Sequence, residues 1–116
     1  MAHYNLGIAF FMTGQFNKAE NAFIKAIGIN PRLNKAWSGL GDLYFHNRQL
    51  EKARISYLKS LEIDPLEGRI HNNLAVIYYY EKKFPEALQH VKEAEKLGFP
   101  ANEEFKKELK KSLGEK

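Results

Sequence analysis

The stretch that decides the fold is Trp37-Ser38-Gly39-Leu40-Gly41-Asp42-Leu43-Tyr44, which is followed by Ala53, Tyr57 and Pro65. Leu40 and Tyr44 are four residues apart, so they share one face of a helix. Gly41 lies between them, where a small residue lets a second helix approach closely. Pro65 ends the second helix, because the residue before a proline is pushed out of the α region. Residues 34–67 therefore predict one helix–turn–helix unit.

The same pattern recurs when the sequence is shifted by about 34 residues in either direction. The matching upstream residues are Leu6, Gly7, Phe10, Ala19, Phe23, Ala26 and Pro31. The matching downstream residues are Leu74, Ala75, Tyr78, Ala87, Val91 and Ala94. The Trp37 position holds His3 and His71, for which we expect partly buried packing. Three copies in register predict an all-α repeat protein.

The repeat pattern sets the expected element boundaries. First helices are expected over residues 2–13, 35–47 and 69–82, and second helices over 17–29, 51–63 and 85–97. Residues 1–116 are expected to form a single domain, with repeats at 1–33, 34–67 and 68–101 and a capping helix at 102–114. Gly14 suits a left-handed turn, and Pro85 suits the first turn of its helix. The proline of the third copy, Pro100, comes one residue late, so its last turn should differ.

The tail at 102–114 has the charge order of a helix, with an N-cap, an acidic first turn and a basic last turn. These positions hold Asn102, Glu103, Glu104, Lys110 and Lys111. An apolar stripe runs through Phe105, Leu109 and Leu113. A repeat stack needs a polar cap at its end. We expect this helix to dock on the third repeat; the alternative is a detachable amphipathic arm that binds another protein.

The composition is that of a packed protein, with 44% hydrophobic and 13% aromatic residues. There is no cysteine, so disulfides and thiolate metal sites are excluded. The longest apolar run, residues 8–12, is too short to span a bilayer, and no secretory segment precedes it. We therefore expect no direct membrane insertion and a soluble, cytoplasmic location. A helix pattern that begins at Ala2 without a cap favours a fragment of a longer array; the alternative is an unusually abrupt natural start.

The spacing Trp37-x2-Leu40-Gly41-x2-Tyr44, with an alanine, an aromatic residue and a proline at set distances, resembles the tetratricopeptide repeat (TPR) family up to about residue 100. The resemblance implies a right-handed α–α superhelix, a solenoid of three helix–turn–helix units plus a capping helix. It also implies that the first helices line a concave groove, which binds a peptide or helix of a partner protein. The implied function is a non-catalytic interaction module or scaffold.

The resemblance also implies which residues face the groove, once the core positions of the first helices are set aside. The implied groove residues are Tyr4, Asn5, Ile8, Phe11, Lys35, Asp42, Phe45, His46, Arg69, Asn72, Asn73, Val76, Tyr79 and Tyr80. Met12, Ser38 and Gly39 belong to the same face. Aromatic rings are frequent binding anchors, and amides can hydrogen-bond a peptide backbone.

Two specialised TPR binding modes can be compared with these positions. A known subclass clamps the C-terminal carboxylate of chaperones with lysine, asparagine and arginine, and of those positions only Arg69 is basic here, which disfavours this reading. Asn5 and Asn73 occupy equivalent positions, like a partial asparagine ladder that Gly39 interrupts. The alternative is that these amides only cap or solvate the helix surface.

Other chemistry finds little support in the sequence. His46 is expected on the groove and His90 on an outer helix surface, and no histidine pair has zinc-ligand spacing with a third donor. We therefore expect no metal, no cofactor and no catalytic residue. Nucleic-acid binding is not expected, because glutamates are interleaved with the lysines of residues 103–111. Self-association, with the exposed first helix stacking on another copy, is the alternative to partner binding.

Overall fold

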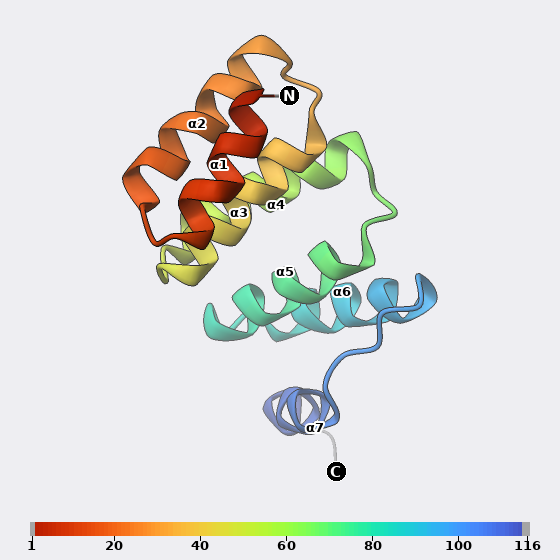
Figure 1. Ribbon diagram of the computed structural model, residues 1–116. Helices are drawn as coiled ribbons and strands as arrows, with labels where there is room; N and C mark the ends of the chain where they lie inside the picture. Colours follow the sequence, from red (N-terminus) through yellow and green to blue (C-terminus); the bar gives the residue numbers. More distant parts are fainter. Residues whose placement is uncertain (1, 115–116) are drawn as a thin grey trace. The chain divides into compact units, whose positions relative to one another are not determined.

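The computed structural model describes residues 2–114, and over these residues the chain forms seven α-helices and no strand (Figure 1). The helices are α1 (Ala2–Met12), α2 (Phe16–Ile29), α3 (Asn34–His46), α4 (Leu50–Ile63), α5 (Gly68–Tyr80), α6 (Phe84–Lys96) and α7 (Glu103–Ser112). Each boundary lies within about two residues of its expected position, which is the usual uncertainty of helix ends. The prediction of an all-α fold built from helix pairs is confirmed.

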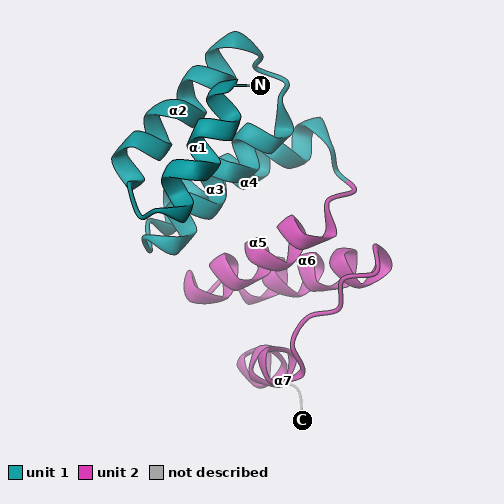
Figure 2. Cartoon of the chain, viewed as in Figure 1, with its two compact units in different colours: residues 1–65 teal, residues 66–116 magenta. Residues whose placement is uncertain are grey.

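The helices belong to two compact units, Met1–Pro65 with α1 to α4 and Leu66–Lys116 with α5 to α7 (Figure 2). We call them unit 1 and unit 2. The single domain expected over residues 1–116, with its repeat boundaries, stays a prediction, and its end residues Met1, Glu115 and Lys116 lie outside the described residues.

The core of unit 1 is organised around an aromatic ring of a second helix that packs against glycines of first helices. A Cβ added to Gly7 in α1 would lie 2.7 Å from the Phe23 ring, and one added to Gly39 in α3 would lie 2.8 Å from it. Phe23, in α2, is fully buried. One repeat later, a Cβ on Gly41 would lie 2.5 Å from the Tyr57 ring. The expected close approach at Gly7 and Gly41 is confirmed, whereas Gly39 proves to be a packing position as well.

The turns within the three helix pairs share one backbone conformation. Gly14, Arg48 and Lys82 have φ angles of 77°, 62° and 60°, and they lie 34 residues apart. In each turn the following residue donates its N–H to a carbonyl five residues back, as Gln15 does to Phe10 at 2.8 Å. The left-handed turn expected at Gly14 is confirmed. Arg48 and Lys82 have the same backbone conformation, although residues with a side chain rarely adopt a positive φ.

The third helix pair ends differently from the first two, as its late proline predicts. α2 and α4 are followed by the C-cap residues Asn30 and Asp64, whose φ angles of −137° and −138° are extended. After α6 the chain turns through Gly98, with a φ of 86°. The next residue, Phe99, then lies against Gly68 at the start of α5.

The tail helix α7 has the cap that its sequence predicts, because the Asn102 side chain accepts hydrogen bonds from the N–H groups of Glu104 and Phe105. Leu109 is 1% exposed and belongs to one buried cluster with Ala75, Ala87 and Val91. α7 is therefore packed on the α5–α6 pair of unit 2.

We predict that Gly41→Ala destabilises the protein by about 1–3 kcal/mol, as overpacked cores do, although alanine is the better helix former. The added methyl group meets the Tyr57 ring, which is fully buried and tied by its hydroxyl to Asp42, so the ring cannot move aside. Urea unfolding monitored by circular dichroism measures the change.

The matched control is Gly28→Ala in α2, where an added Cβ meets nothing within 4 Å. We expect that change to raise the free energy of unfolding by up to about 1 kcal/mol. Equal effects of the two substitutions would contradict the close packing of Gly41.

Candidate functional site

An apolar hollow of about 170 Å3 lies on the α1–α3 face of unit 1. Its lining residues come from three helices and are Ile8, Phe11, Met12, Phe23, Gly39 and Asp42. Three of the predicted groove residues, Ile8, Phe11 and Asp42, thus meet here. Gly39 lets the Phe23 ring approach α3, and both residues form part of the wall of the hollow.

The polar group that lines this hollow is the Asp42 carboxylate, and the buried residue Tyr57 fixes its position. The Tyr57 hydroxyl donates a hydrogen bond of 2.5 Å to Asp42 Oδ1. Since Tyr57 is fully buried, this bond satisfies its hydroxyl and fixes the carboxylate at the same time. The result is a pre-formed apolar surface with one negative group at its edge.

An aromatic cluster lies beside this hollow and restrains the Phe11 ring. The Phe11 ring centre is 5.9 Å from that of Phe16 and 5.7 Å from that of His46, and the rings of Phe16 and His46 are 5.3 Å apart. Phe45, also expected in the groove, packs edge-on against the Tyr57 ring at 6.4 Å. Phe11 and Phe45, which were predicted to anchor a partner, therefore also pack against other aromatic rings of unit 1.

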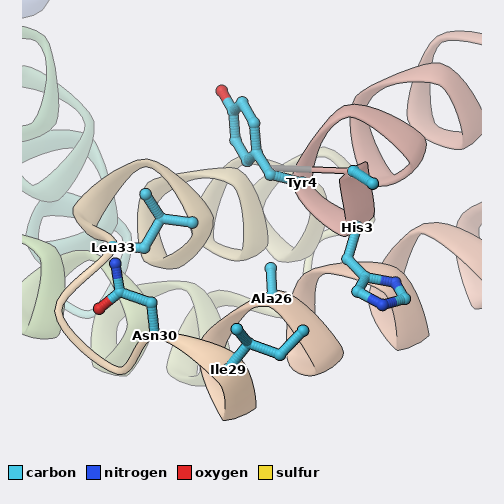
Figure 3. A pocket seen from close by; sticks show the side chains of 7 residues that line it. His3, Tyr4, Ala26, Ile29, Asn30 and Leu33 are labelled. Carbon is cyan, nitrogen blue, oxygen red and sulfur yellow. The ribbon is translucent and has the colours of Figure 1, made fainter.

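A second hollow of unit 1, about 80 Å3, lies where the start of α1 meets the end of α2 (Figure 3). Figure 3 shows His3 and Tyr4 on α1 and Ala26 and Ile29 on α2, with the Tyr4 ring pointing away from Ala26 and Ile29. Tyr4 also packs on Phe23, with ring centres 6.0 Å apart. Tyr4 therefore lies at the end of the helix pair, apart from the residues that line the α1–α3 hollow.

In unit 2, a hollow of about 330 Å3 lies between α5 and the start of α7. It brings together four predicted groove residues, namely Asn72, Asn73, Val76 and Tyr80. Asn72 Nδ2 donates to the Phe99 carbonyl at 2.8 Å, whereas Asn72 Oδ1 is buried without a hydrogen-bond partner. Asn72 thus holds the α6–α7 connection and keeps one acceptor unused.

The remaining predicted residues fall outside these hollows. Tyr79 packs inside unit 2, with ring centres 5.6 Å from Phe84 and 5.4 Å from Phe105, so replacing it would disturb the core. Asn5, Lys35 and Arg69 are exposed and line none of the hollows described above. Sequence reasoning missed that the tail contributes Pro100, Ala101, Asn102 and Phe105 to the unit 2 hollow. The sequence of the tail did not indicate that these residues line a hollow, because its apolar residues equally fit a stripe that only caps the last repeat.

Three lysines of α7, namely Lys106, Lys107 and Lys111, lie close to glutamates. Lys106 Nζ lies 2.7 Å from Glu95 Oε2, and this hydrogen bond raises the pKa of Lys106. Lys107 and Lys111 lie within 4.0 Å of glutamates one turn earlier in α7. Such interleaved charges lack the separated positive stripe that would follow a phosphate backbone.

Residues 2–114 contain neither a metal-binding cluster of side chains nor a membrane-spanning helix. Within that range no three histidine or acidic side chains gather as they would around a metal ion. No helix there has the length and apolarity needed to cross a bilayer.

A histidine pair, with His71 buried and His90 half-buried, corrects one expectation from the sequence. His90, expected on an outer surface, turns towards α5, where its Nδ1 lies 2.9 Å from the Nδ1 of His71 and its ring stacks on Tyr78. Burial and the neighbouring His71 lower the pKa of His90 from 6.5 to about 4, against an opposing effect of Glu93. His71 itself is buried, as its position in the repeat predicts.

Repeated helix pairs that present hollows lined by apolar residues and a few polar groups define a class of helical-repeat interaction proteins. Family models described as "Tetratricopeptide repeat" match residues 1–33 and 32–97. The chain belongs to the tetratricopeptide repeat family, whose fold is typically a non-catalytic protein-interaction scaffold. Comparison with curated proteins gives no match.

Two solved structures are similar to this chain. The crystal structure of MamA is 29% identical with a TM-score of 0.81, over 84% of this chain and 57% of that one. This chain therefore spans little more than half of the MamA structure. The TPR2B domain of yeast Sti1, solved in a complex with pHsp70, is 19% identical with a TM-score of 0.77, over 83% of this chain and 77% of that one.

We predict that acidification weakens unit 2 through the His71–His90 pair. The pKa of His90 is lower in the folded than in the unfolded chain, so between pH 7 and pH 4 the unfolded chain binds more protons. The free energy of unfolding should therefore fall over that window, by about 1–2 kcal/mol after allowance for solvent screening, and be level above it.

Amide hydrogen exchange of α5 and α6 at pH 7 and pH 5 measures this effect. The control is His90→Gln, which cannot titrate and should lose most of the pH dependence that distinguishes unit 2 from unit 1. If wild type and variant respond alike, the pair does not govern the stability of unit 2.

Proposed function

We propose that this chain is a non-catalytic interaction module that binds an extended or helical segment of a partner protein on the inner face of its first helices. The α1–α3 hollow of unit 1 is proposed as the anchor pocket, in which an apolar side chain of the partner is buried. The observation that carries the proposal is the convergence of Ile8, Phe11 and Met12 around a hollow that Gly39 and Phe23 also line.

The energetics of this hollow favour binding. Met12 is 79% exposed and Ile8 is 38% exposed, so apolar area is available for burial. Burying such area stabilises a complex by about 25 cal/mol per Å2 before the entropic costs of association. The pocket also needs little rearrangement, because Phe23 and Asp42 are already fixed by packing and hydrogen bonding.

The charge at the hollow suggests which partner segments fit. The Asp42 carboxylate borders the apolar walls, so the proposed ligand carries a basic residue or a backbone N–H beside its apolar anchor. Asn73 in the unit 2 hollow is proposed to hydrogen-bond a partner backbone, as one of the amides of the ladder. Sti1, which shares the fold, forms a complex with pHsp70, so the fold is compatible with binding another protein.

The alternatives receive less support. Nucleic-acid binding lacks a separated positive stripe, since the α7 lysines lie beside glutamates. Self-association through the repeat ends stays an alternative, for which concentration-dependent mass in sedimentation is the direct measurement.

We predict that Met12→Glu weakens binding of a peptide selected on the wild-type chain from a displayed library by at least about tenfold. A charge at this exposed position places a carboxylate beside Asp42 and removes apolar contact area, while the fold is unaffected because the side chain is in solvent. Isothermal titration calorimetry gives the affinity. Amide shifts of Ile8, Gly39 and Asp42 in NMR spectra locate the peptide.

The matched control is Ile55→Glu, the same kind of change at a position of α4 that is 55% exposed and does not line the hollow. It should leave the affinity unchanged. Asp42→Asn keeps a hydrogen-bond acceptor for Tyr57 and should weaken only peptides with a basic residue. Selected peptides that bind Met12→Glu as well as wild type would show that the α1–α3 hollow is not the anchor pocket.

A further inference from the structure

The α1–α3 hollow of unit 1 carries one charged group among apolar walls. The walls include Ile8 and Met12, and the charged residue of the lining is Asp42. Lys35 and His46, the predicted groove residues of α3 that can carry positive charge, lie outside this lining. A side chain that enters the hollow therefore meets both apolar surface and a carboxylate.

A purely apolar occupant is mismatched with this carboxylate. Such an occupant would displace water from Asp42 without supplying a hydrogen-bond donor in return, which is costly for a charged group. A carboxylate has about four lone-pair sites, so Asp42 can accept a bond from an occupant in addition to the bond from Tyr57. A positively charged occupant supplies the donor and the opposite charge together.

Unit 1 already holds ammonium groups of its own against aromatic rings. Lysine Nζ atoms lie 5.8, 5.6 and 6.0 Å from the ring centres in the pairs Lys18–Phe10, Lys52–Tyr44 and Lys59–Trp37. These distances are typical of favourable cation–π contacts. The half-buried Phe11 ring lines the hollow, so a cation in the hollow can make the same kind of contact.

We propose that the anchor that enters the α1–α3 hollow is a single long basic side chain, lysine or arginine, of the partner protein. Its aliphatic stem packs on Ile8 and Met12, as the stems of such residues do on apolar surfaces. Its charged end pairs with Asp42 beside the Phe11 ring. This inference rests on the proposed function, because it uses the same hollow, and it adds the chemistry of the anchor.

The fixed position of the carboxylate favours this occupant over others. Tyr57 is fully buried and donates to Asp42 Oδ1, so the carboxylate loses little freedom when a ligand binds. A long basic side chain has enough rotatable bonds to reach such a fixed point. An acidic side chain is the poorest occupant, because it would place a second carboxylate beside Asp42.

Four capped pentapeptides of sequence Ala-Ala-Xaa-Ala-Ala test this inference. Xaa is lysine or arginine in two of them, and norleucine or citrulline, the uncharged counterparts, in the other two. Each is titrated into the isotope-labelled 116-residue chain, where the amide shifts of Ile8, Gly39 and Asp42 report occupancy of the hollow. We expect each basic peptide to bind about fivefold more tightly than its uncharged counterpart, with a difference that shrinks as salt is raised.

Asp42→Asn is the decisive variant, because it removes the charge and keeps an acceptor for the Tyr57 hydroxyl. It should abolish the preference for the basic peptides. The matched control is Glu51→Gln, which removes an exposed carboxylate of α4 that does not line the hollow and should leave the preference unchanged.

The inference is overturned if norleucine binds as tightly as lysine, or if Asp42→Asn keeps the preference for lysine. In either case the proposed function stands, with an apolar anchor in the same hollow. The inference also fails if none of the four peptides shifts these amides. A library-selected peptide that then still shifts them supports the proposed function, whereas one that binds without shifting them contradicts both.

Discussion

The contact between a second-helix ring and a first-helix glycine is the interaction on which unit 1 depends. Phe23 is enclosed between Gly7 of its own pair and Gly39 of the next, so one ring fixes both the spacing within a pair and the stacking of one pair on another. Neither glycine position can accept a methyl group without displacing the ring. In an interior packed this densely, an added methyl group displaces neighbouring side chains, because there is no free space to accommodate it.

The same ring and one of its glycines also line the candidate binding hollow. Gly39 lets the buried Phe23 ring approach α3, and both residues line the hollow between α1 and α3. Asp42 stands at the edge of that space because Tyr57, the ring of the next pair, needs an acceptor for its buried hydroxyl. Packing and recognition thus use the same few residues, and the proposed site is pre-formed for that reason.

The repeat period was sufficient to predict helix positions, the Gly7 and Gly41 contacts and the turn at Gly14, because each follows from local spacing or conformational preference. The repeat period could not predict contacts between side chains of different helices that are specific to one repeat. His90 looks like a surface residue on α6 until the partner nitrogen of His71 is known. Tyr79 has the spacing of a groove residue, yet Phe84 and Phe105 surround it, and Phe105 comes from a tail outside the repeat.

Substitutions at equivalent positions then make each pair distinct. Trp37 donates its Nε1–H to the Pro31 carbonyl at 2.9 Å and fills the space at the start of α3. His3 is smaller, and the hollow of Figure 3 lies beside it. His71 at the same position instead finds His90 and places a titratable pair inside unit 2. Rings and small residues therefore maintain the backbone pattern along the chain, whereas one variable position, at the start of the first helices, yields a filled space, an open hollow and a pH-sensitive contact.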